Sequence, residues 1–315
     1  MIEASGLTKD HPGGRAVDRV DFTVRPGVVT GFLGPNGAGK STTMRMIVGL
    51  DRPTSGHVTV NGKAYAQHRA PLGEVGALLD ATAVHGGRSA RAHLLSLAAT
   101  HGIHPRRVDE VLDMAGLADV ARRRVRTFSL GMGQRLGIAA ALLGDPRTLI
   151  LDEPVNGLDP EGVHWIRTLL RGLAAEGRTV LLSSHLMSEM ALTADHLLIL
   201  GRGRVLVDAP TRDVVERAQT RTVRVRTPMR GELERELARQ PGVGAVAVEH
   251  DVLDATGIDA PGVAALAASA GIVLHGLAPV HVSLEEAYLQ LTADAVEHRS
   301  AAPAGIRHDT PGGRA

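Results

Sequence analysis

Residues 34–41 carry the clearest chemical signal in the sequence, because they read Gly-Pro-Asn-Gly-Ala-Gly-Lys-Ser and fit the pattern G-x-x-x-x-G-K-[ST]. The apolar run Val28–Leu33 precedes them and predicts a strand, and a helical run, Thr42–Leu50, follows. Glycines let successive backbone N–H groups turn inward toward phosphate oxygens, and a helix N-terminus adds partial positive charge. We therefore expect a phosphate-binding loop for a nucleoside triphosphate, formed by Gly34, Pro35, Asn36, Gly37, Ala38, Gly39, Lys40, Ser41 and Thr42.

Two acidic residues supply the rest of the expected reaction site. In this pattern Lys40 neutralises the β- and γ-phosphates, and the hydroxyl of Ser41 is a ligand for Mg²⁺. A second apolar strand, Leu149–Leu151, ends in Asp152 and Glu153. Asp152 is expected beside the Mg²⁺ ion, and Glu153 is expected to polarise the attacking water. Together these residues predict a nucleoside triphosphatase.

The composition of the 315 residues excludes several other classes of protein. The net charge is +1, so the overall charge gives no sign of a nucleic-acid partner. The chain contains no cysteine, which excludes disulfide bonds, thiolate zinc sites and cysteine nucleophiles. The segment Gly262–Val280 is apolar, but Gly271 and Pro279 interrupt it, so we interpret it as a helix and a strand rather than a membrane span.

The pattern of hydrophobic residues predicts two domains. Residues 1–217 alternate apolar strands with helical stretches, as an α/β fold requires, and residues 86–145 within them are helical in pattern. A strand at Thr148–Leu151, a strand at Val180–Leu182 and a hairpin from Leu197 to Val207 are expected.

Residues 218–296 have a different pattern, which predicts a small α+β domain. The expected order is strand, helix, two strands, helix and strand, which is the ferredoxin-like arrangement, and the last of these strands is placed at Ile272–Leu277. A terminal helix is expected at Ser283–Leu291 with Ser283 as its N-cap. Residues 297–315 are rich in Pro, Gly and Ala and are predicted to be a disordered tail.

Three further segments make the sequence resemble the ATP-binding-cassette (ABC) family. Phe128–Arg135 lies where that family has its signature, usually Leu-Ser-Gly-Gly-Gln, and opens an Ala/Leu helix. Asn156–Pro160 resembles the D-loop of the family, and Ser183–His185 resembles the segment with its switch histidine. The order and spacing of these segments match the family from Gly34 to His185.

The resemblance implies a P-loop cassette with a RecA-like core, a β-subdomain and a helical subdomain, which binds ATP and Mg²⁺. It also implies a head-to-tail dimer in which two copies hold ATP between them. Ser129 and the N–H of Gly131 would then contact the γ-phosphate bound by Lys40 of the second copy, and Asp159 would lie near the nucleotide. His185 would hold the γ-phosphate or the water as a third catalytic residue beside Lys40 and Glu153.

The sequence departs from the family pattern at three places. Leu130 and Met132 replace the first glycine and the final glutamine of the signature. Asp80 falls at the position of the Q-loop glutamine, where it either binds Mg²⁺ through water or is a surface residue without a metal role. His11 falls where an aromatic residue usually stacks on adenine, and a solvent-facing loop histidine is the alternative.

The resemblance implies the ATPase subunit of a two-component exporter of the drug- and antibiotic-export branch. Its partners would be a second copy of itself and a separate integral-membrane permease, at the cytoplasmic face of the membrane, with no nucleic acid. The alternatives are a non-transport ABC ATPase acting on ribosomes or DNA, and a nucleotide-sensing regulator. A single cassette and the short spacing between Leu72 and Ser129, which leaves no room for a long coiled coil, argue against the first of them.

Overall fold

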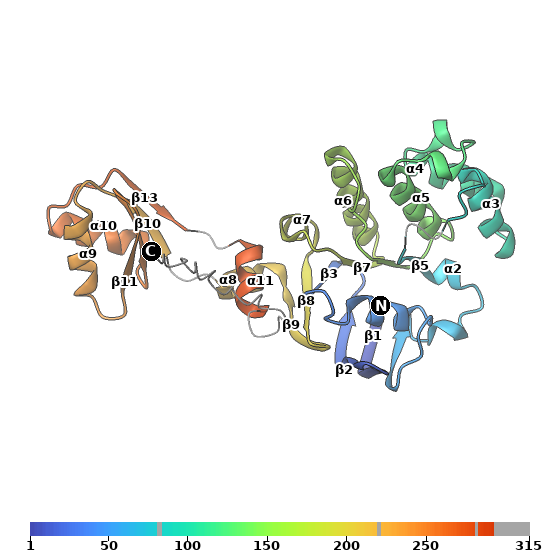
Figure 1. The fold of residues 1–315 in the computed structure, drawn as a ribbon, viewed down its shortest axis with the longest axis horizontal. Helices are drawn as coiled ribbons and strands as arrows, with labels where there is room; N and C mark the ends of the chain where they lie inside the picture. The colour runs from blue at the N-terminus through green and yellow to red at the C-terminus, as the bar shows by residue number, and fades with distance from the viewer. Residues whose placement is uncertain (81–83, 219–221, 281–282, 293–315) are drawn as a thin grey trace, which may run out of the picture.

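The computed structural model describes residues 1–80, 84–218, 222–280 and 283–292, and the predicted tail at 297–315 lies outside them. We call residues 1–218 the cassette. Its centre is a six-stranded sheet (Figure 1). In spatial order the strands are β5 (Val75–Leu78), β6 (Thr148–Leu151), β7 (Thr179–Ser183), β3 (Val29–Leu33), β8 (His196–Gly201) and β9 (Arg204–Pro210).

The sheet is parallel except at one edge, where β8 and β9 form the predicted antiparallel hairpin. Every residue of β3, β6 and β7 is buried, because layers cover both faces of the sheet. This is why these strands appear in the sequence as short, continuous apolar runs rather than as alternating patterns.

A second sheet covers one face of the first. It is three-stranded and antiparallel, in the order β2 (Gly14–Val24), β1 (Ile2–His11) and β4 (Ser55–Val60). Ile2, Val24 and Val60 from these strands are fully buried against Phe32 of β3 in one hydrophobic cluster. Figure 1 shows this sheet below the central sheet, with the helices of residues 90–175 on the other side. Helix α1 (Lys40–Ile47) packs on the side of the three-stranded sheet, because its Met44 and Ile47 belong to the same cluster.

Three α-helices lie in residues 86–145, where the sequence predicts helical structure: α3, α4 and α5. They pack against one another beyond β5 (Figure 1). The α-helices of the cassette are α1 (Lys40–Ile47), α2 (Pro71–Glu74), α3 (Ala90–Thr100), α4 (Pro105–Met114), α5 (Leu130–Leu142), α6 (Pro160–Ala175), α7 (Met187–Thr193) and α8 (Thr211–Ala218). Short 3-10 helices lie at Tyr65–Gln67, Ala118–Val120 and Val125–Thr127.

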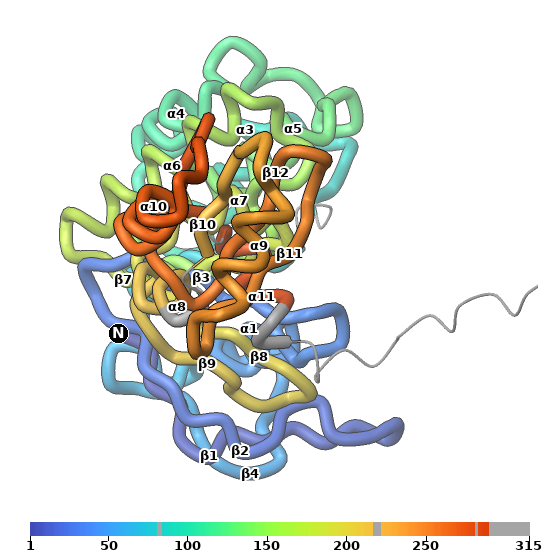
Figure 2. Tube along the Cα trace, turned by 90° about the vertical axis from the view of Figure 1, so that its left-hand side faces the viewer, coloured from blue at the N-terminus to red at the C-terminus, as the bar shows by residue number. Residues whose placement is uncertain are grey.

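The small C-terminal unit contains a four-stranded antiparallel sheet in the order β11 (Gly244–Glu249), β12 (Val252–Thr256), β10 (Thr222–Arg226) and β13 (Gly276–Pro279). Helices α9 (Arg230–Ala238) and α10 (Ala260–Ser269) pack with it around one buried cluster. This strand order is that of the ferredoxin-like fold, as the sequence predicts. Figure 2 looks toward this unit, with the cassette behind it.

The last strand of this unit does not lie where the sequence places it. The prediction of a strand at Ile272–Leu277 is wrong in its start, because β13 begins at Gly276. Gly271 has φ +68° and ends α10, and the N–H of Ile272 donates to the carbonyl of Ala267, which closes the last turn of the helix. Residues 272–275 therefore form the connection rather than part of the strand.

The terminal helix α11 (Leu284–Thr292) returns to the cassette and packs against α7 and α8. Leu284 and Ala287 are buried in the same cluster as Met187 and Val214 of those helices. Its N-terminus has the predicted cap, because Ser283 Oγ accepts from the N–H of Glu286 at 3.1 Å. The boundary at residue 217 between the two domains stays a prediction. No helix in the described residues is long and apolar enough to cross a membrane.

Candidate ATP-binding and hydrolysis site

Four neighbouring parallel strands end at the same edge of the central sheet, and the predicted site residues follow them directly. The register pairs Leu151 of β6 with Leu182 of β7, and Phe32 of β3 with Ser183. Asp152, Ser183 and the start of the phosphate loop therefore leave the sheet side by side. This is the edge where ligands bind in open α/β sheets.

The phosphate loop is tightly packed against its surroundings, which explains two of its glycines. Gly34 and Gly39 have φ +155° and +100°. A Cβ on Gly34 would lie 2.5 Å from the carbonyl oxygen of Leu200, and one on Gly39 would lie 2.5 Å from that of Ala16. Only glycine fits at both positions, and Gly39 is also the N-cap of α1. The loop thus presents backbone N–H groups and a helix N-terminus together.

The ammonium group of Lys40 lies inside this loop. Its Nζ donates to the carbonyl oxygens of Gly34 at 2.6 Å and Pro35 at 3.2 Å. Burial lowers the pKa of Lys40, and the nearby carboxylates of Glu153 and Asp152 act in the opposite direction. The loop therefore holds a desolvated positive charge, which interacts more strongly with a phosphate than an exposed lysine would.

Asp152 joins the loop to the neighbouring strands. Ser41 Oγ donates to Asp152 Oδ2 at 2.9 Å, and Ser183 Oγ donates to Asp152 Oδ1. Mg²⁺ in nucleotide sites takes one or two protein oxygens and completes its shell with phosphates and water. A hydroxyl and a carboxylate in contact fit that requirement, so Ser41 and Asp152 would hold the ion, which would neutralise phosphate charge.

Glu153 and His185 are also brought together. His185 Nδ1 lies 2.8 Å from Glu153 Oε2, and the N–H of His185 donates to the same oxygen at 3.3 Å. Glu153 has φ +50°, a backbone conformation that residues other than glycine rarely adopt. Such strain is typical of functional positions, and the carboxylate of Glu153 lies against His185, the predicted switch histidine. A base held by an imidazole can orient and polarise a water.

A cavity of about 590 Å³ opens beside these residues. Ser41, Asp80, Asp152 and Tyr65 are among the residues that line it. Asp80 is exposed and follows β5, the strand next to β6. Its position beside the predicted metal ligands is compatible with a water-mediated contact to Mg²⁺, and its role stays a prediction.

The signature residues lie at the start of α5 and contact their own D-loop segment. Ser129 is the N-cap of α5, and its Oγ accepts from the N–H of Met132 at 3.2 Å. A Cβ on Gly131 would lie 2.7 Å from the carbonyl oxygen of Gly157, so this glycine permits a close approach of two backbones. Asp159 caps α6 by accepting from the N–H of Gly162 at 2.9 Å.

Leu130, which replaces a signature glycine, is accommodated by a glycine on the facing segment. Leu130 is the first residue of α5 and its side chain is largely exposed. Gly157 has φ +74°, and a Cβ there would lie 2.4 Å from Leu130 Cγ. The missing side chain at Gly157 thus leaves room for the leucine, and the start of α5 keeps ordinary helical geometry.

His11 lies at the far end of β1, next to the hairpin that joins β1 to β2. It pairs with Gly14, and its side chain is exposed. It does not line the cavity described above. Its stacking on adenine stays a prediction.

Two residues that contact the site, Ser183 and Gln134, are not among the predicted site residues. Ser183 is fully buried and contacts both acidic residues, because its Oγ also accepts from the N–H of Glu153 at 2.9 Å. Gln134 of α5 is buried and donates from Nε2 to the carbonyl oxygen of Glu153 at 3.1 Å. The parallel pairing of β6 and β7 would have indicated Ser183, but nothing in the sequence indicates the contact of Gln134.

The ABC transporter profile matches residues 17–156, and a domain of unknown function matches residues 221–285. The bacitracin transport ATP-binding protein BcrA of Bacillus licheniformis is 42% identical over 213 residues, which are 67% of this chain and 70% of that protein. The daunorubicin/doxorubicin resistance ATP-binding protein DrrA of Streptomyces peucetius is 33% identical over 314 residues, which are 95% of this chain and 94% of that protein.

Solved structures agree with these relatives. An ATP-binding subunit of an ABC transporter has a TM-score of 0.63 and 28% identity, over 69% of this chain and 92% of that one. A dimeric cassette, MJ0796, in a post-hydrolysis state bound to ADP and Pi has a TM-score of 0.61 and 25% identity, over 67% and 98%. Similarity along most of the length of such relatives establishes that this chain belongs to the ABC transporter family, as an ATP-binding subunit with ATPase activity.

Proposed function

We propose that the chain is the ATP-hydrolysing subunit of a two-component exporter that removes a drug, an antibiotic or a similar compound through a separate membrane permease. The observation that carries this proposal is the similarity to DrrA, which extends over 95% of the chain and so includes the C-terminal unit. BcrA supports it independently over the cassette. The two relatives are a transport protein and a resistance protein by name, and a site for ATP hydrolysis is what such a subunit contributes.

In this proposal Mg²⁺ is held by Ser41 and Asp152, Lys40 neutralises the phosphates, and Glu153 and His185 act on the attacking water. Two copies bind head to tail, so that Ser129 and Gly131 of one copy face the γ-phosphate bound by the other. Closure on ATP and opening after hydrolysis then drive a permease, with the chain at the cytoplasmic face of the membrane. The dimeric state of the MJ0796 cassette supports this arrangement.

Isolation of the tagged chain from membranes tests the proposal. We expect a protein with several membrane spans to co-purify in a fixed ratio, and co-expression of the pair to reduce accumulation of a compound in the cell. Lys40→Ala is the matched control, because it should keep the complex and lose the transport. Sedimentation of the chain with ribosomes in the presence of ATP, without any membrane protein, would contradict the proposal.

A further inference from the structure

The turn between β8 and β9, residues 201–204, lies between the phosphate loop and β2. Gly203 is buried in this turn and has φ +76°. A Cβ on Gly203 would lie 2.8 Å from the carbonyl oxygen of Ala16 in β2. The turn is therefore packed directly against β2. The same carbonyl oxygen of Ala16 also lies close to Gly39 of the phosphate loop.

Two backbone hydrogen bonds connect β2 to the phosphate loop through this turn. The N–H of Asp18 donates to the carbonyl oxygen of Gly203 at 2.8 Å, and the N–H of Gly203 donates to the carbonyl oxygen of Ala38 at 3.1 Å. Ala38 belongs to the phosphate loop and is itself buried. The position of the turn thus decides where the Ala38 carbonyl points.

The direction of that carbonyl fixes the direction of an N–H group in the loop. In a trans peptide the C=O and the following N–H are coplanar and point in opposite directions. When Gly203 holds the Ala38 carbonyl toward the turn, the N–H of Gly39 must point away from the turn. Gly39 is the N-cap of α1, directly before Lys40, so its N–H is one of the donors that surround a bound phosphate.

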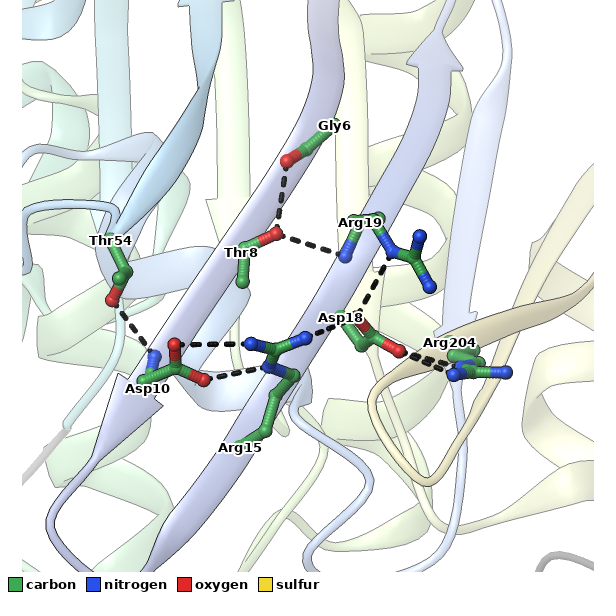
Figure 3. Close-up of polar contacts among 8 residues, drawn as sticks. All are labelled: Gly6, Thr8, Asp10, Arg15, Asp18, Arg19, Thr54 and Arg204. Atoms are coloured by element: carbon green, nitrogen blue, oxygen red, sulfur yellow. Dashed lines mark hydrogen bonds and ion pairs between the residues drawn. The ribbon is translucent and has the colours of Figure 1, made fainter.

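The side chains of Asp18 and Arg204 hold the turn in place (Figure 3). Arg204 donates to Asp18 Oδ2 from Nε at 2.8 Å and from Nη2 at 2.6 Å. Arg15 Nη1 donates to Asp18 Oδ1 at 2.9 Å, and Arg19 Nε lies 3.4 Å from the same oxygen. Only 8% of the Asp18 side chain is exposed, whereas the Arg204 side chain extends over the surface.

The charges around Asp18 favour its ionised form. The hydrogen bond from Arg204 is the largest cause that lowers the pKa of Asp18, while burial acts in the opposite direction. Asp10, the other carboxylate in this network, is bound by Arg15 at 2.7 Å. Asp18 is thus the shared acceptor that links the β8–β9 turn, through Arg204, to β2.

We propose that Asp18 and Arg204 are positioning residues for ATP, which act by holding the β8–β9 turn so that Gly203 directs the N–H of Gly39 toward the phosphate. This inference rests on ATP binding at the phosphate loop but not on the transported compound or the permease. Neither residue touches ATP, and their effect is on nucleotide affinity rather than on the chemical step.

The proposal is tested with three variants of the purified full chain: Asp18→Asn, Arg204→Ala and Arg204→Lys. Isothermal titration calorimetry measures the Kd of each for Mg²⁺–ATP and for ADP, and steady-state kinetics give KM and kcat. We expect Arg204→Ala and Asp18→Asn to raise the Kd for ATP about tenfold, the effect of weakening one hydrogen bond to a charged group. Arg204→Lys keeps the charge but loses the two-nitrogen contact, so its effect should be smaller. The kcat at saturating ATP should stay within about twofold of wild type, because Glu153 and His185 are unchanged.

The double variant Asp18→Asn/Arg204→Ala should bind ATP no more weakly than the worse single variant, because both changes release the same turn. Asp109→Asn is the matched control. It removes a similar ion pair between α3 and α4, in which Arg91 Nε lies 2.7 Å from Asp109 Oδ1. We expect its Kd for ATP to equal that of wild type. The amide resonance of Gly39 in an NMR spectrum should shift in Asp18→Asn and stay in place in Asp109→Asn.

Unchanged Kd and KM in Asp18→Asn, with only a lower melting temperature, would show that the pair serves stability alone and would overturn the proposal. A fall in kcat at unchanged KM would overturn it as well. If Lys40→Ala binds ATP as wild type does, the phosphate-loop assignment has failed instead. A wrong assignment of drug export would leave all of these binding results unaltered.

Discussion

The predicted site has two halves, one at the carboxyl edge of the central sheet and one at the start of α5. They differ in whether their predicted site residues contact one another within one chain. At the sheet edge Ser41, Asp152, Ser183, Glu153 and His185 are joined by direct hydrogen bonds within one chain. At the start of α5 the Oγ of Ser129 only caps its own helix, and Gly131 packs against Gly157. Among the described residues, no hydrogen bond joins Ser129 or Gly131 to Lys40.

The difference indicates that ATP binding and ATP hydrolysis depend on different parts of the site. We expect the sheet edge to bind nucleotide and metal by itself, because its donors and carboxylates are already in contact. The start of α5 presents a helix N-terminus, which favours a phosphate group. The phosphate loop of the same chain makes no hydrogen bond to Ser129 or Gly131 there, so a phosphate at this helix N-terminus would have to be bound by another copy. The structure is therefore consistent with ATP binding by one copy and hydrolysis only when a second copy contributes its α5.

The largest expected effect is at the sheet edge. Lys40→Ala removes the partly buried ammonium group that lies within the loop, so we expect ATP hydrolysis to fall by more than about 100-fold, as for other preorganised charges at reacting groups. Lys63→Ala, at an exposed lysine, is the matched control and should hydrolyse ATP as wild type does. Phosphate release measures both. Near-normal hydrolysis by Lys40→Ala would show that the loop is not the site.

A change at the start of α5 should separate hydrolysis from binding. Gly131→Ala places a Cβ 2.7 Å from the carbonyl of Gly157, which must shift one of the two segments. We expect hydrolysis to fall about tenfold while the Kd of the single chain for ATP stays unchanged, since the sheet edge is intact. Gly133→Ala is the control, because its Cβ would meet no atom within 4 Å. Equal loss of ATP affinity in Gly131→Ala would contradict the division between the two regions.

The smallest expected effect concerns Asp80 in the cavity beside the metal ligands. In the predicted metal role, Asp80 would act on Mg²⁺ only through water. Asp80→Asn should then raise the Mg²⁺ concentration for half-maximal hydrolysis about threefold, with little change in kcat. A titration with Mg²⁺ at saturating ATP measures this. An unchanged Mg²⁺ dependence would indicate that Asp80 is a surface residue without a metal role.

The sequence predicts much of the fold and the sheet edge, because the signals there are local. Short apolar runs followed by Gly34, Asp152 or His185 indicate buried parallel strands whose ends carry polar residues. The ferredoxin-like order of the C-terminal unit also follows from strand and helix patterns. The start of its last strand was wrong because Ile272 closes a helix turn, which hydrophobicity alone does not reveal.

Contacts between distant segments could not be predicted in the same way. The hydrogen bond from Gln134 to the Glu153 carbonyl depends on how α5 packs against β5, the strand next to β6. The link from Asp18 through Gly203 to Ala38 depends on three separate segments. The packing of Leu130 against Gly157 is a further case. In the sequence Leu130 is only a departure from the signature pattern, and Gly157 is only a glycine in a turn. Such contacts between distant residues are determined by tertiary packing, and the spacing of residues in the sequence does not indicate them.

The mass of Glu153→Gln in solution with ATP tests the central claim most directly. This substitution keeps the size of the side chain and removes the proposed base, so ATP should bind and persist between two copies. Size-exclusion chromatography with light scattering should give twice the 33.1 kDa mass of the chain with Mg²⁺–ATP, and the single mass with ADP or with Lys40→Ala added to the variant. A variant that binds ATP and stays monomeric would contradict an ATP site completed by a second copy.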